Sequence, residues 1–511
     1  MTRRLVISAS VLIAVGCGGA GRIATSGPSK VDIPAADGTH APKNGGAGAA
    51  RQSAPASGVV KESPFPRVAR FTLANGLSVA VVTVRALPIV QARLLVRAGS
   101  GDGPTPAVAA LTGSMLKEGG TRALSSSDLL RRVETLGGDL SVVTSFDSTV
   151  LALPLTKDQL GEGLSLLSQV VREPRFDEGE LHKLKARATD AAEDEARSSG
   201  EWTALHLVFR ELFPEKSAYA NLGTLPSQIA KVDGAAVRAF HRRFYVPKAA
   251  TLVLAGDVEE AEARALAERH FGAWTGGEQP KVERAAPRAP AKLRVLVAHR
   301  PKSEKADIYL ATLGPARKSE SWAAVRVANQ VLGGGVASRL FTEVREQRGL
   351  AYEVHARSFE LASGEQPVLA YARTETAKTS QTVAALLESF GRMTSAPPTS
   401  SETETARGYV SDVFAIHLES IGSIADLVVT QDEFGLPDGY WDAYRKQLRA
   451  TDATQVEAAA KKLYTTLDKA LIVVAGDADA IAPDLAKLGD VTVVDPEKEF
   501  KTMRTLTQVS K

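Results

Sequence analysis

An arginine and a tyrosine flank a predicted helix-to-strand corner in the second half of the chain. Residues 333–358 read GGGVASRLFTEVREQRGLAYEVHARS. Apolar residues at helical spacing after the three glycines predict a short amphipathic helix that Ser338 or a neighbour caps and Gly349 ends. The alternation of apolar and polar residues that follows predicts a half-buried strand. Arg345 and Tyr352 would flank the turn, where a guanidinium and a phenol could grip a peptide carbonyl or carboxylate.

The bulk composition predicts a large folded protein with no affinity for nucleic acid. With 511 residues, 44% of them hydrophobic, the chain can bury large cores and should hold two or more domains. Its formal net charge of +3 is close to balance, and no basic cluster is interleaved with aromatic residues.

The N-terminus has the pattern of an exported lipoprotein. Arg3 and Arg4 precede an apolar run, residues 5–15, that is too short to span a bilayer. Residues 14–17, AVGC, resemble a lipoprotein box, which implies a signal peptide over residues 1–17 and a lipid anchor on Cys17. We expect a bacterial cell-envelope protein on the outer or inner membrane, facing the periplasm; the alternative is an ordinary signal peptide with an incidental cysteine. Cys17 is the sole cysteine, so internal disulfides are excluded.

A linker and an internal duplication organise the rest of the chain. Residues 18–62 are Gly, Ala, Pro and Ser with few large apolar residues, which predicts a flexible tether. The segment VDGAAVRAFHRRFYVPKAATLVLAGDV in the first half is similar to ATDATQVEAAAKKLYTTLDKALIVVAGDAD in the second. We therefore predict two tandem, homologous α+β domains, each a mixed sheet packed on helices. The predicted boundaries are 63–278, an exposed linker at 279–292, 293–496, and a C-terminal tail at 497–511.

Two stretches resemble the insulinase/pitrilysin family, zinc peptidases whose ligand motif is an inverted HxxEH. They are RFTLANGLSVAVV near the start of the folded region and SRLFTEVREQRGLAYEV in the second half. The resemblance implies that Arg345 and Tyr352 hold substrate. It also implies that Gly333, Gly334 and Gly335 stand in the glycine-rich loop of the non-catalytic, alpha-type subunits of two-subunit members.

The same resemblance implies that the zinc motif has been lost. The stretch AVAALTGSMLKEGGT lies where the family carries its zinc helix. The two histidine positions fall on Ala110 and Ser114, and the general-base position falls on Gly113. The third ligand position falls on Ala192, or on Glu193 if the register shifts by one residue. A methyl group, a hydrogen atom and a hydroxymethyl group cannot replace imidazole and carboxylate on zinc.

The histidine spacing supports the same conclusion without any alignment. The two closest histidines, His182 and His206, are too far apart to share a helical face as a zinc pair, and one cysteine cannot form a thiolate site. A metal assembled from distant histidines is the remaining alternative. Ser114 lies in no GxSxG elbow, and the glycines at 333–335 lack the GK[ST] ending of a phosphate-binding loop.

The sequence therefore predicts a non-catalytic subunit. It would bind peptide segments through Arg345 and Tyr352, carry no cofactor, and complete the chamber of an HxxEH-bearing partner that holds the zinc. Two alternatives stay open, an active zinc metalloendopeptidase with a degenerate site and a peptide-binding or scaffold lipoprotein without a protease partner. A purely structural role is also open, with Arg345 solvated or paired to Glu343 or Glu346 and Tyr352 packed in the core.

Overall fold

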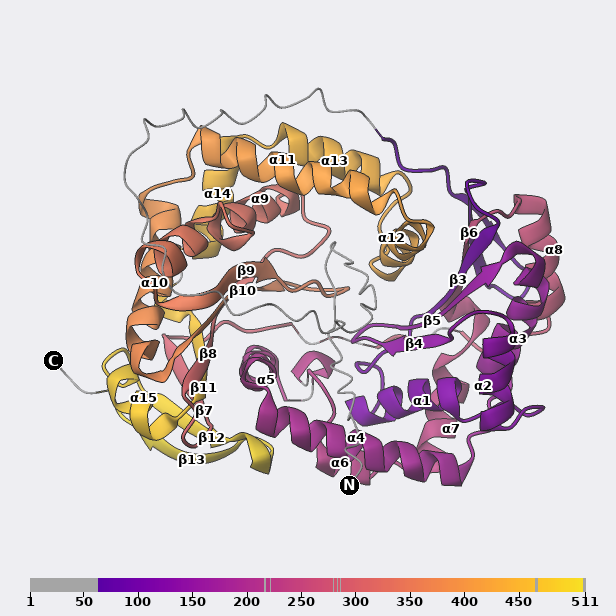
Figure 1. Cartoon of the computed structure of the whole chain (residues 1–511), viewed down its shortest axis with the longest axis horizontal. Coiled ribbons are helices and arrows are strands. Elements are labelled where there is room, and N and C mark those ends of the chain that lie inside the picture. The colour runs from indigo at the N-terminus through magenta and orange to yellow at the C-terminus, as the bar shows by residue number, and fades with distance from the viewer. Residues whose placement is uncertain are drawn as a thin grey trace, which may run out of the picture.

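The computed structural model describes residues 63–508, apart from residues 216, 221, 279, 283, 285, 465 and 466. It contains two mixed β-sheets with helices packed on them, one on each side of the molecule (Figure 1). This arrangement confirms the α+β class and the two domains of similar architecture. The predictions for residues 1–62, which include the signal peptide, Cys17 and the tether, lie outside the described residues.

The first half contains six strands and eight α-helices within the described residues. The strands are β1 (Ala69–Thr72), β2 (Ser78–Thr83), β3 (Ile89–Val96), β4 (Ser141–Thr144), β5 (Thr149–Thr156) and β6 (Ala250–Gly256). The helices are α1 (Pro106–Glu118), α2 (Ser126–Thr135), α3 (Leu160–Arg172), α4 (Glu178–Ser198), α5 (Gly200–Leu212), α6 (Pro226–Ala230), α7 (Gly234–Phe244) and α8 (Glu260–Phe271).

The second half repeats this series and adds a C-terminal hairpin. Its strands are β7 (Arg294–His299), β8 (Lys305–Gly314), β9 (Ala351–Ser358), β10 (Gln366–Glu375), β11 (Leu471–Gly476), β12 (Val491–Asp495) and β13 (Lys501–Leu506). Its helices are α9 (Trp322–Gly333), the π-helix η4 (Phe341–Gln347), α10 (Thr379–Ser395), α11 (Ser400–His417), α12 (Ile421–Glu433), α13 (Tyr440–Ala450), α14 (Ala453–Tyr464) and α15 (Ala478–Leu485).

The strand orders demonstrate the duplication. The first sheet runs β1-β2-β6-β3-β5-β4, and the second runs β13-β12-β7-β11-β8-β10-β9. The block β2-β6-β3-β5-β4 matches β7-β11-β8-β10-β9 strand for strand, and in each block only the first pair is parallel. In each sheet the last strand of the block, β4 or β9, lies at an edge and pairs on one side only.

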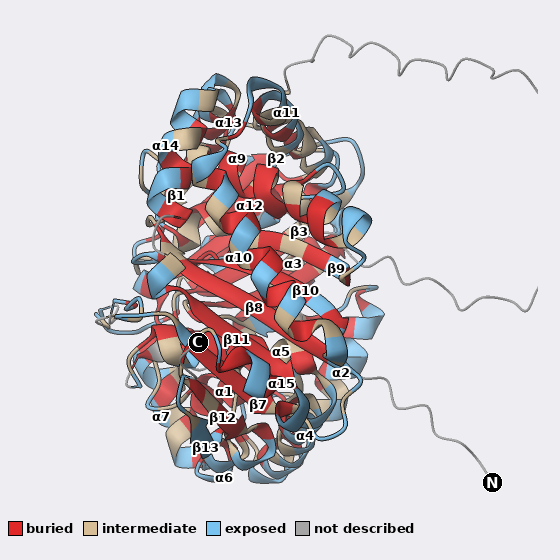
Figure 2. Ribbon diagram, turned by 90° about the vertical axis from the view of Figure 1, so that its left-hand side faces the viewer, coloured by how far each residue is buried: buried red, intermediate tan, exposed pale blue. Residues whose placement is uncertain are grey.

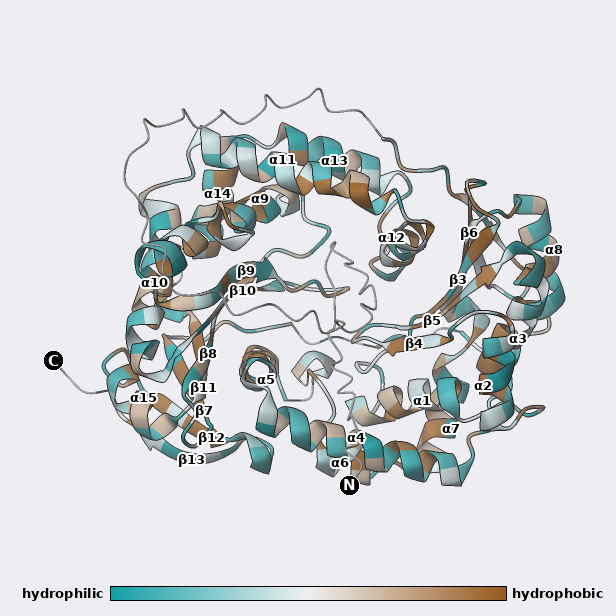
Figure 3. Cartoon of the chain, viewed as in Figure 1, coloured by the Kyte–Doolittle hydropathy of each residue, from teal (hydrophilic) through white to brown (hydrophobic). Residues whose placement is uncertain are grey.

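The central strands are apolar along their whole length because both of their faces are covered. Every residue of β6 (ATLVLAG) and β11 (LIVVAG) is buried, which is the pattern of a strand between two helical layers. Figure 2 shows the same burial across β8 and β11. Hydrophobic residues occupy these sheets, while the outer helices carry many hydrophilic residues (Figure 3).

Each half supplies the helix that covers the second face of the other half's sheet. On the first sheet, α12 packs its apolar side against strands β2, β3 and β6, with Ile421, Ile424, Ala425, Val428 and Val429 meeting Ala80, Val82, Leu95, Val253 and Ala255. On the second sheet, α5 packs in the same way against β7, β8 and β11, with Ala204, Leu207 and Val208 meeting Leu296, Ala298, Tyr309, Ala311 and Val473. The two halves are therefore joined by a reciprocal exchange of helices.

Ion pairs surround the α12 contact. Arg93 binds Asp426 at 2.9 Å, and Arg70 binds Asp432 at 2.9 Å. At the end of the helix, the carboxylate of Glu433 accepts a hydrogen bond of 2.6 Å from the Ser148 hydroxyl on the β4–β5 turn. Burial raises the pKa of Glu433. The polar contacts fix the position of an otherwise apolar helix on the first sheet.

The segment between the halves is anchored rather than fully exposed, which differs from the expected exposed linker. The guanidinium of Arg284 is largely buried and lies 3.1 Å from carboxylate oxygens of both Asp102 and Asp147. It also donates to the carbonyl of Gly101 at 2.9 Å. Arg284 was not recognisable as buried because its partners lie far away in the sequence.

Two further differences concern the C-terminus and a helix face. Residues 501–506, expected in a tail, form β13 and pair with β12. The spacing of Leu129, Leu130 and Val133 predicts that all three lie on the apolar face of α2, but Leu130 is exposed, whereas Leu129 and Val133 are buried.

No single helix among the described residues is long and apolar enough to cross a membrane. The consecutive pair α11 and α12 meets the criteria of length and composition together, but with a bend of 116° between them.

Candidate functional site

The predicted corner exists, with local geometry that the sequence did not reveal. Gly333 ends α9, and residues 341–347 form a π-helix rather than an α-helix. The backbone carbonyl of Ser338 accepts a hydrogen bond of 3.0 Å from the Thr342 N–H. The Ser338 hydroxyl accepts a longer one, 3.4 Å, from the Phe341 N–H. Gly349 ends the helix in the left-handed region, with φ +57°, and so allows the chain to turn into β9.

A β-bulge in β9 turns Tyr352 out of the sheet. Arg373 on β10 pairs with Glu353, but the next residue, Thr374, pairs with Ala351, so Tyr352 is the extra residue that faces no partner. The Thr374 hydroxyl donates to the carbonyl of Leu350 at 2.6 Å and fixes the start of the strand. Tyr352 is consequently 81% exposed. The simple alternation had placed it on the same face as the buried Val354.

The side chain of Arg345 lies between two aromatic rings. Its guanidinium carbon is 4.5 Å from the ring centre of Phe341 and 4.7 Å from that of Tyr352. The structure thus brings the two predicted substrate-binding residues into contact. The possible structural partner Glu343 is engaged elsewhere, by the Ser389 hydroxyl at 2.8 Å and by Arg392 at 3.1 Å.

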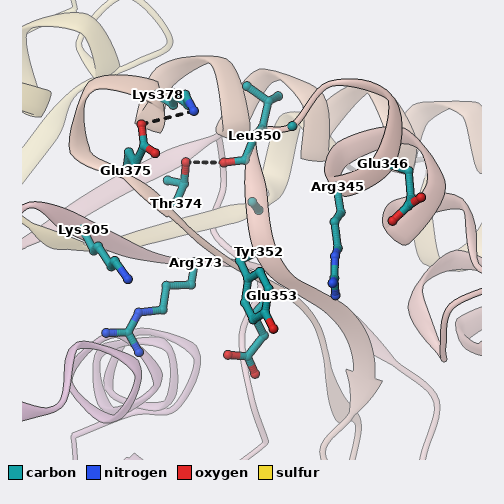
Figure 4. A pocket seen from close by; sticks show the side chains of 12 residues that line it. Lys305, Arg345, Glu346, Leu350, Tyr352, Glu353, Arg373, Thr374, Glu375 and Lys378 are labelled. Carbon is teal, nitrogen blue, oxygen red and sulfur yellow. Dashed lines mark hydrogen bonds and ion pairs between the residues drawn. The ribbon is translucent and has the colours of Figure 1, made fainter. Parts of the chain in front are cut away.

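A pocket of about 750 Å³ opens beside this pair. Charged side chains from β8, η4, β9, β10 and the short 3-10 helix η5 (Thr376–Lys378) line it (Figure 4). The cationic ones are Lys305, Arg345, Arg373 and Lys378, and the anionic ones are Glu346, Glu353 and Glu375. Sequence reasoning missed Lys305 and Arg373, because strand pairing brings them here from positions distant in the chain.

The three glycines lie close to this site without lining the pocket. A Cβ on Gly333 would come within 2.3 Å of the backbone nitrogen of Ala356, and one on Gly334 would come within 2.1 Å of the Gln330 side chain. Close packing of α9 against β9 therefore explains Gly333, while at Gly334 the side chain of Gln330 on α9 fills the space. Gly335 has open space around it, and nothing in the structure explains its choice.

The side chains at the predicted zinc positions do not fit a zinc ion. The Ser114 hydroxyl donates to the carbonyl of Ala110 at 3.1 Å within α1. A Cβ on Gly113 would lie 2.4 Å from the Thr144 hydroxyl, so β4 occupies the space of the general base. Ala192 on α4 is buried in the apolar core, and its alternative Glu193 is exposed.

One other group of potential metal ligands, which the sequence did not suggest, is engaged in hydrogen bonds and an ion pair. His299, Asp477 and Asp479 have ligand atoms within 4.8 Å of one another. However, His299 Nδ1 accepts from Ala478 N at 3.2 Å, and Asp477 accepts from the backbone of Lys302 and Asp479. A hydrogen bond from Arg504 lowers the pKa of Asp479. These contacts account for the cluster as a helix cap.

Burial keeps a histidine neutral on the strand that carries Tyr352. The ring of His355 lies tilted against Tyr371 with ring centres 5.0 Å apart, and burial lowers the pKa of His355 to about 4. The Tyr371 hydroxyl donates to Asp307 at 2.6 Å, and burial raises its pKa. His355 therefore stiffens β9 as an apolar ring and carries no charge near neutral pH.

Two α+β halves with exchanged helices and an arginine–tyrosine pair at the start of an edge strand define a duplicated fold. Two family models match the chain, "Insulinase (Peptidase family M16)" over residues 79–211 and "Peptidase M16 inactive domain" over residues 231–409. The chain belongs to the insulinase family, peptidase M16.

Similar proteins include both presumed peptidases and a homologue described as inactive. An uncharacterized zinc protease of Mycobacterium leprae is 28% identical over 313 residues, covering 60% of this chain and 69% of that protein. A non-peptidase homologue, YmxG of Helicobacter pylori, is 25% identical over 360 residues, covering 68% and 80%. The crystal structure of a peptidase M16 inactive domain from Pseudomonas fluorescens superposes with a TM-score of 0.73 at 27% identity, covering 80% and 98%.

Proposed function

We propose that the chain is a non-catalytic insulinase-family subunit that binds extended peptide segments and completes the chamber of a zinc-bearing partner. The partner would be a homologue that retains HxxEH, and it would supply the zinc. Through a lipid on Cys17, the pair would be held at the bacterial cell envelope with the folded part facing the periplasm.

The observation that carries the proposal is the contrast between the two candidate sites. The zinc positions hold Ala110, Ser114 and Ala192, which offer at most one weak ligand. The predicted substrate-binding pair, in contrast, is in place, with the half-buried Arg345 over the ring of the exposed Tyr352. A residue that only packed would not be 81% exposed, as Tyr352 is.

The edge strand offers a way to hold the peptide backbone. Within the described residues β9 pairs only with β10, so its outer edge is open to a further strand. An extended peptide paired there would have its carbonyl or carboxylate groups next to Arg345 and Tyr352. The bulge at Tyr352 interrupts the edge and marks the place where backbone pairing gives way to side-chain contact.

Reconstitution tests this function. The purified chain, mixed with an HxxEH-bearing homologue encoded beside it, should hydrolyse a fluorogenic peptide faster than the homologue alone. Arg345→Ala and Tyr352→Phe should reduce that gain, while Arg348→Ala should leave it intact, because Arg348 pairs with Glu388. Equal rates of hydrolysis with all variants would show that Arg345 and Tyr352 do not hold the substrate.

Two measurements separate the alternatives. Stoichiometric zinc in the purified chain, with chelator-sensitive hydrolysis in the absence of a partner, would make it a peptidase with a degenerate site. Peptide binding without any co-purifying homologue would make it a peptide-binding or scaffold lipoprotein. For the anchor, Cys17→Ala should move the protein from the membrane to the soluble fraction.

A further inference from the structure

The guanidinium of Arg345 contacts two aromatic rings and forms no ion pair among the described residues. Phe341 and Tyr352 both stack on it, with guanidinium-to-ring distances of 4.5 Å and 4.7 Å. Stacking of this kind leaves the N–H donors, which point outward in the guanidinium plane, available to a ligand. A planar fork of donors matches the two oxygens of a carboxylate.

No carboxylate of the described chain occupies that position. Arg345 forms no ion pair with any residue that the structure describes, whereas Arg348, three residues further along, pairs with Glu388 at 2.7 Å. Lys305 on the opposite side of the same pocket also has no ion pair in the described part of the chain. The pocket thus holds two cations without an anion of their own.

The acidic residues of the pocket are directed elsewhere or stand apart. Glu375 pairs with Lys378 at 3.1 Å. Glu346 lies on the side of Arg345 away from Tyr352 (Figure 4). Glu353, which neighbours Tyr352 on β9, forms no ion pair among the described residues. Arg345 and Lys305 therefore have no paired carboxylate in the described part of the chain.

We propose that the ligand group held by Arg345 is a carboxylate, so that the pocket selects peptide segments with an acidic side chain or a free C-terminus. This inference rests on the proposed peptide binding and adds its chemical selectivity. A carbonyl would use one donor of the fork, whereas a carboxylate uses two and neutralises the charge.

Paired peptides test the selectivity on the full mature chain. The first pair is an acetylated and amidated, dye-labelled decapeptide with one central Glu and its Gln counterpart. The second pair is the Gln peptide with a free C-terminal carboxylate or an amide. Fluorescence anisotropy should give dissociation constants about tenfold lower for a carboxylate peptide, the strength expected of a charge-assisted pair. The pair that shows the difference identifies the source of the carboxylate.

Three variants assign the preference to this site. Arg345→Gln should abolish the preference for a carboxylate, and Arg348→Gln, the same change three residues further along the chain, should preserve it. Glu353→Gln should strengthen it two- to threefold because it removes a nearby negative charge, a gain that misfolding cannot imitate. Equal affinities within both peptide pairs, with binding still dependent on Arg345, would overturn the inference and leave the proposed function standing. Failure of every peptide to bind would overturn the proposed function itself.

Discussion

The backbone N–H of Ala362 donates a hydrogen bond of 2.9 Å to Asp147, and this contact joins the turn of the β9–β10 hairpin to the turn of its counterpart, the β4–β5 hairpin. The other oxygen of Asp147 accepts from Tyr219 at 2.6 Å and lies 3.1 Å from Arg284. Beside it, Phe146 meets Phe359 edge to face with ring centres 6.2 Å apart. The two edge hairpins therefore meet tip to tip, and the connecting segment fastens them.

Removing the arginine from this contact should destabilise the whole chain. Arg284→Ala would leave the buried carboxylates of Asp102 and Asp147 without their cation, a loss that typically costs about 3–5 kcal/mol. Urea denaturation should show this decrease in the free energy of unfolding. Arg288→Ala, an exposed site in the same segment, should change it by less than about 0.5 kcal/mol. Similar values for the two variants would refute the role of Arg284.

The exchanged helix α12 should contribute a large share of the stability through its apolar face. Ile424 is buried against the first sheet, and its replacement by Ala should cost about 2–5 kcal/mol. Ile416 on the neighbouring helix α11 is 63% exposed, so Ile416→Ala should be almost neutral. The two variants make the same chemical change at a buried and at an exposed position. An equally small loss of stability in Ile424→Ala would contradict the packing described for α12.

Buried histidines should make the protein less stable in mild acid. Burial lowers the pKa of His206 to about 3, with both ring nitrogens unpartnered, while the unfolded chain takes up protons below its ordinary pKa of 6.5. The unfolded state then binds more protons, so the free energy of unfolding falls by about 1.4 kcal/mol per pH unit below pH 6.5 for this residue.

A substitution at His206 isolates that contribution. His206→Phe keeps a ring against Phe500, whose centre lies 4.5 Å away. The difference in unfolding free energy between pH 7 and pH 5 should be about 2 kcal/mol smaller than in the wild type. His182→Gln, at an exposed histidine, should behave as the wild type does. An unchanged pH dependence in His206→Phe would show that His206 does not titrate as described.

The threonine that closes the β-bulge should position Tyr352. Thr374→Val removes the donor to the carbonyl of Leu350, which should weaken peptide binding severalfold and cost about 1–3 kcal/mol of stability. Thr374→Ser keeps the hydroxyl and should restore binding. Thr312→Val is the matched control, since that buried hydroxyl on β8 has no partner and its loss should be neutral. Unchanged peptide binding by Thr374→Val would show that the bond from Thr374 to Leu350 does not position Tyr352 for binding.

The sequence predicted local features well. An Asn-Gly pair between two β-rich runs predicts a hairpin turn, and Asn75 and Gly76 form one, with Gly76 at φ +92°. The pattern of residues 89–96 predicts a strand, and β3 spans Ile89–Val96. Ser125 and Asp233 have the residue types of helix caps, and each accepts a backbone hydrogen bond at the start of its helix. In each case the physical cause lies within a few residues of the pattern.

Features that depend on distant partners could not be predicted in this way. The bulge at Tyr352 requires Thr374 on the adjacent strand, and the burial of Arg284 requires Asp102 and Asp147. Leu130 has the correct period for a buried face but lies where α2 has no neighbour. The sequence predicted the helix-to-strand corner with Arg345 and Tyr352. It did not predict that Lys305, Arg373 and Lys378 line the same pocket.

Because α5 and α12 are exchanged, neither half of the chain has a covered sheet on its own. A polypeptide that contained only one of the two repeats would expose an apolar sheet face to water, and it would aggregate or bind a helix of another protein. The smallest unit that can shield both sheets from water is accordingly the fused pair, because each half provides the helix that covers the other half's sheet.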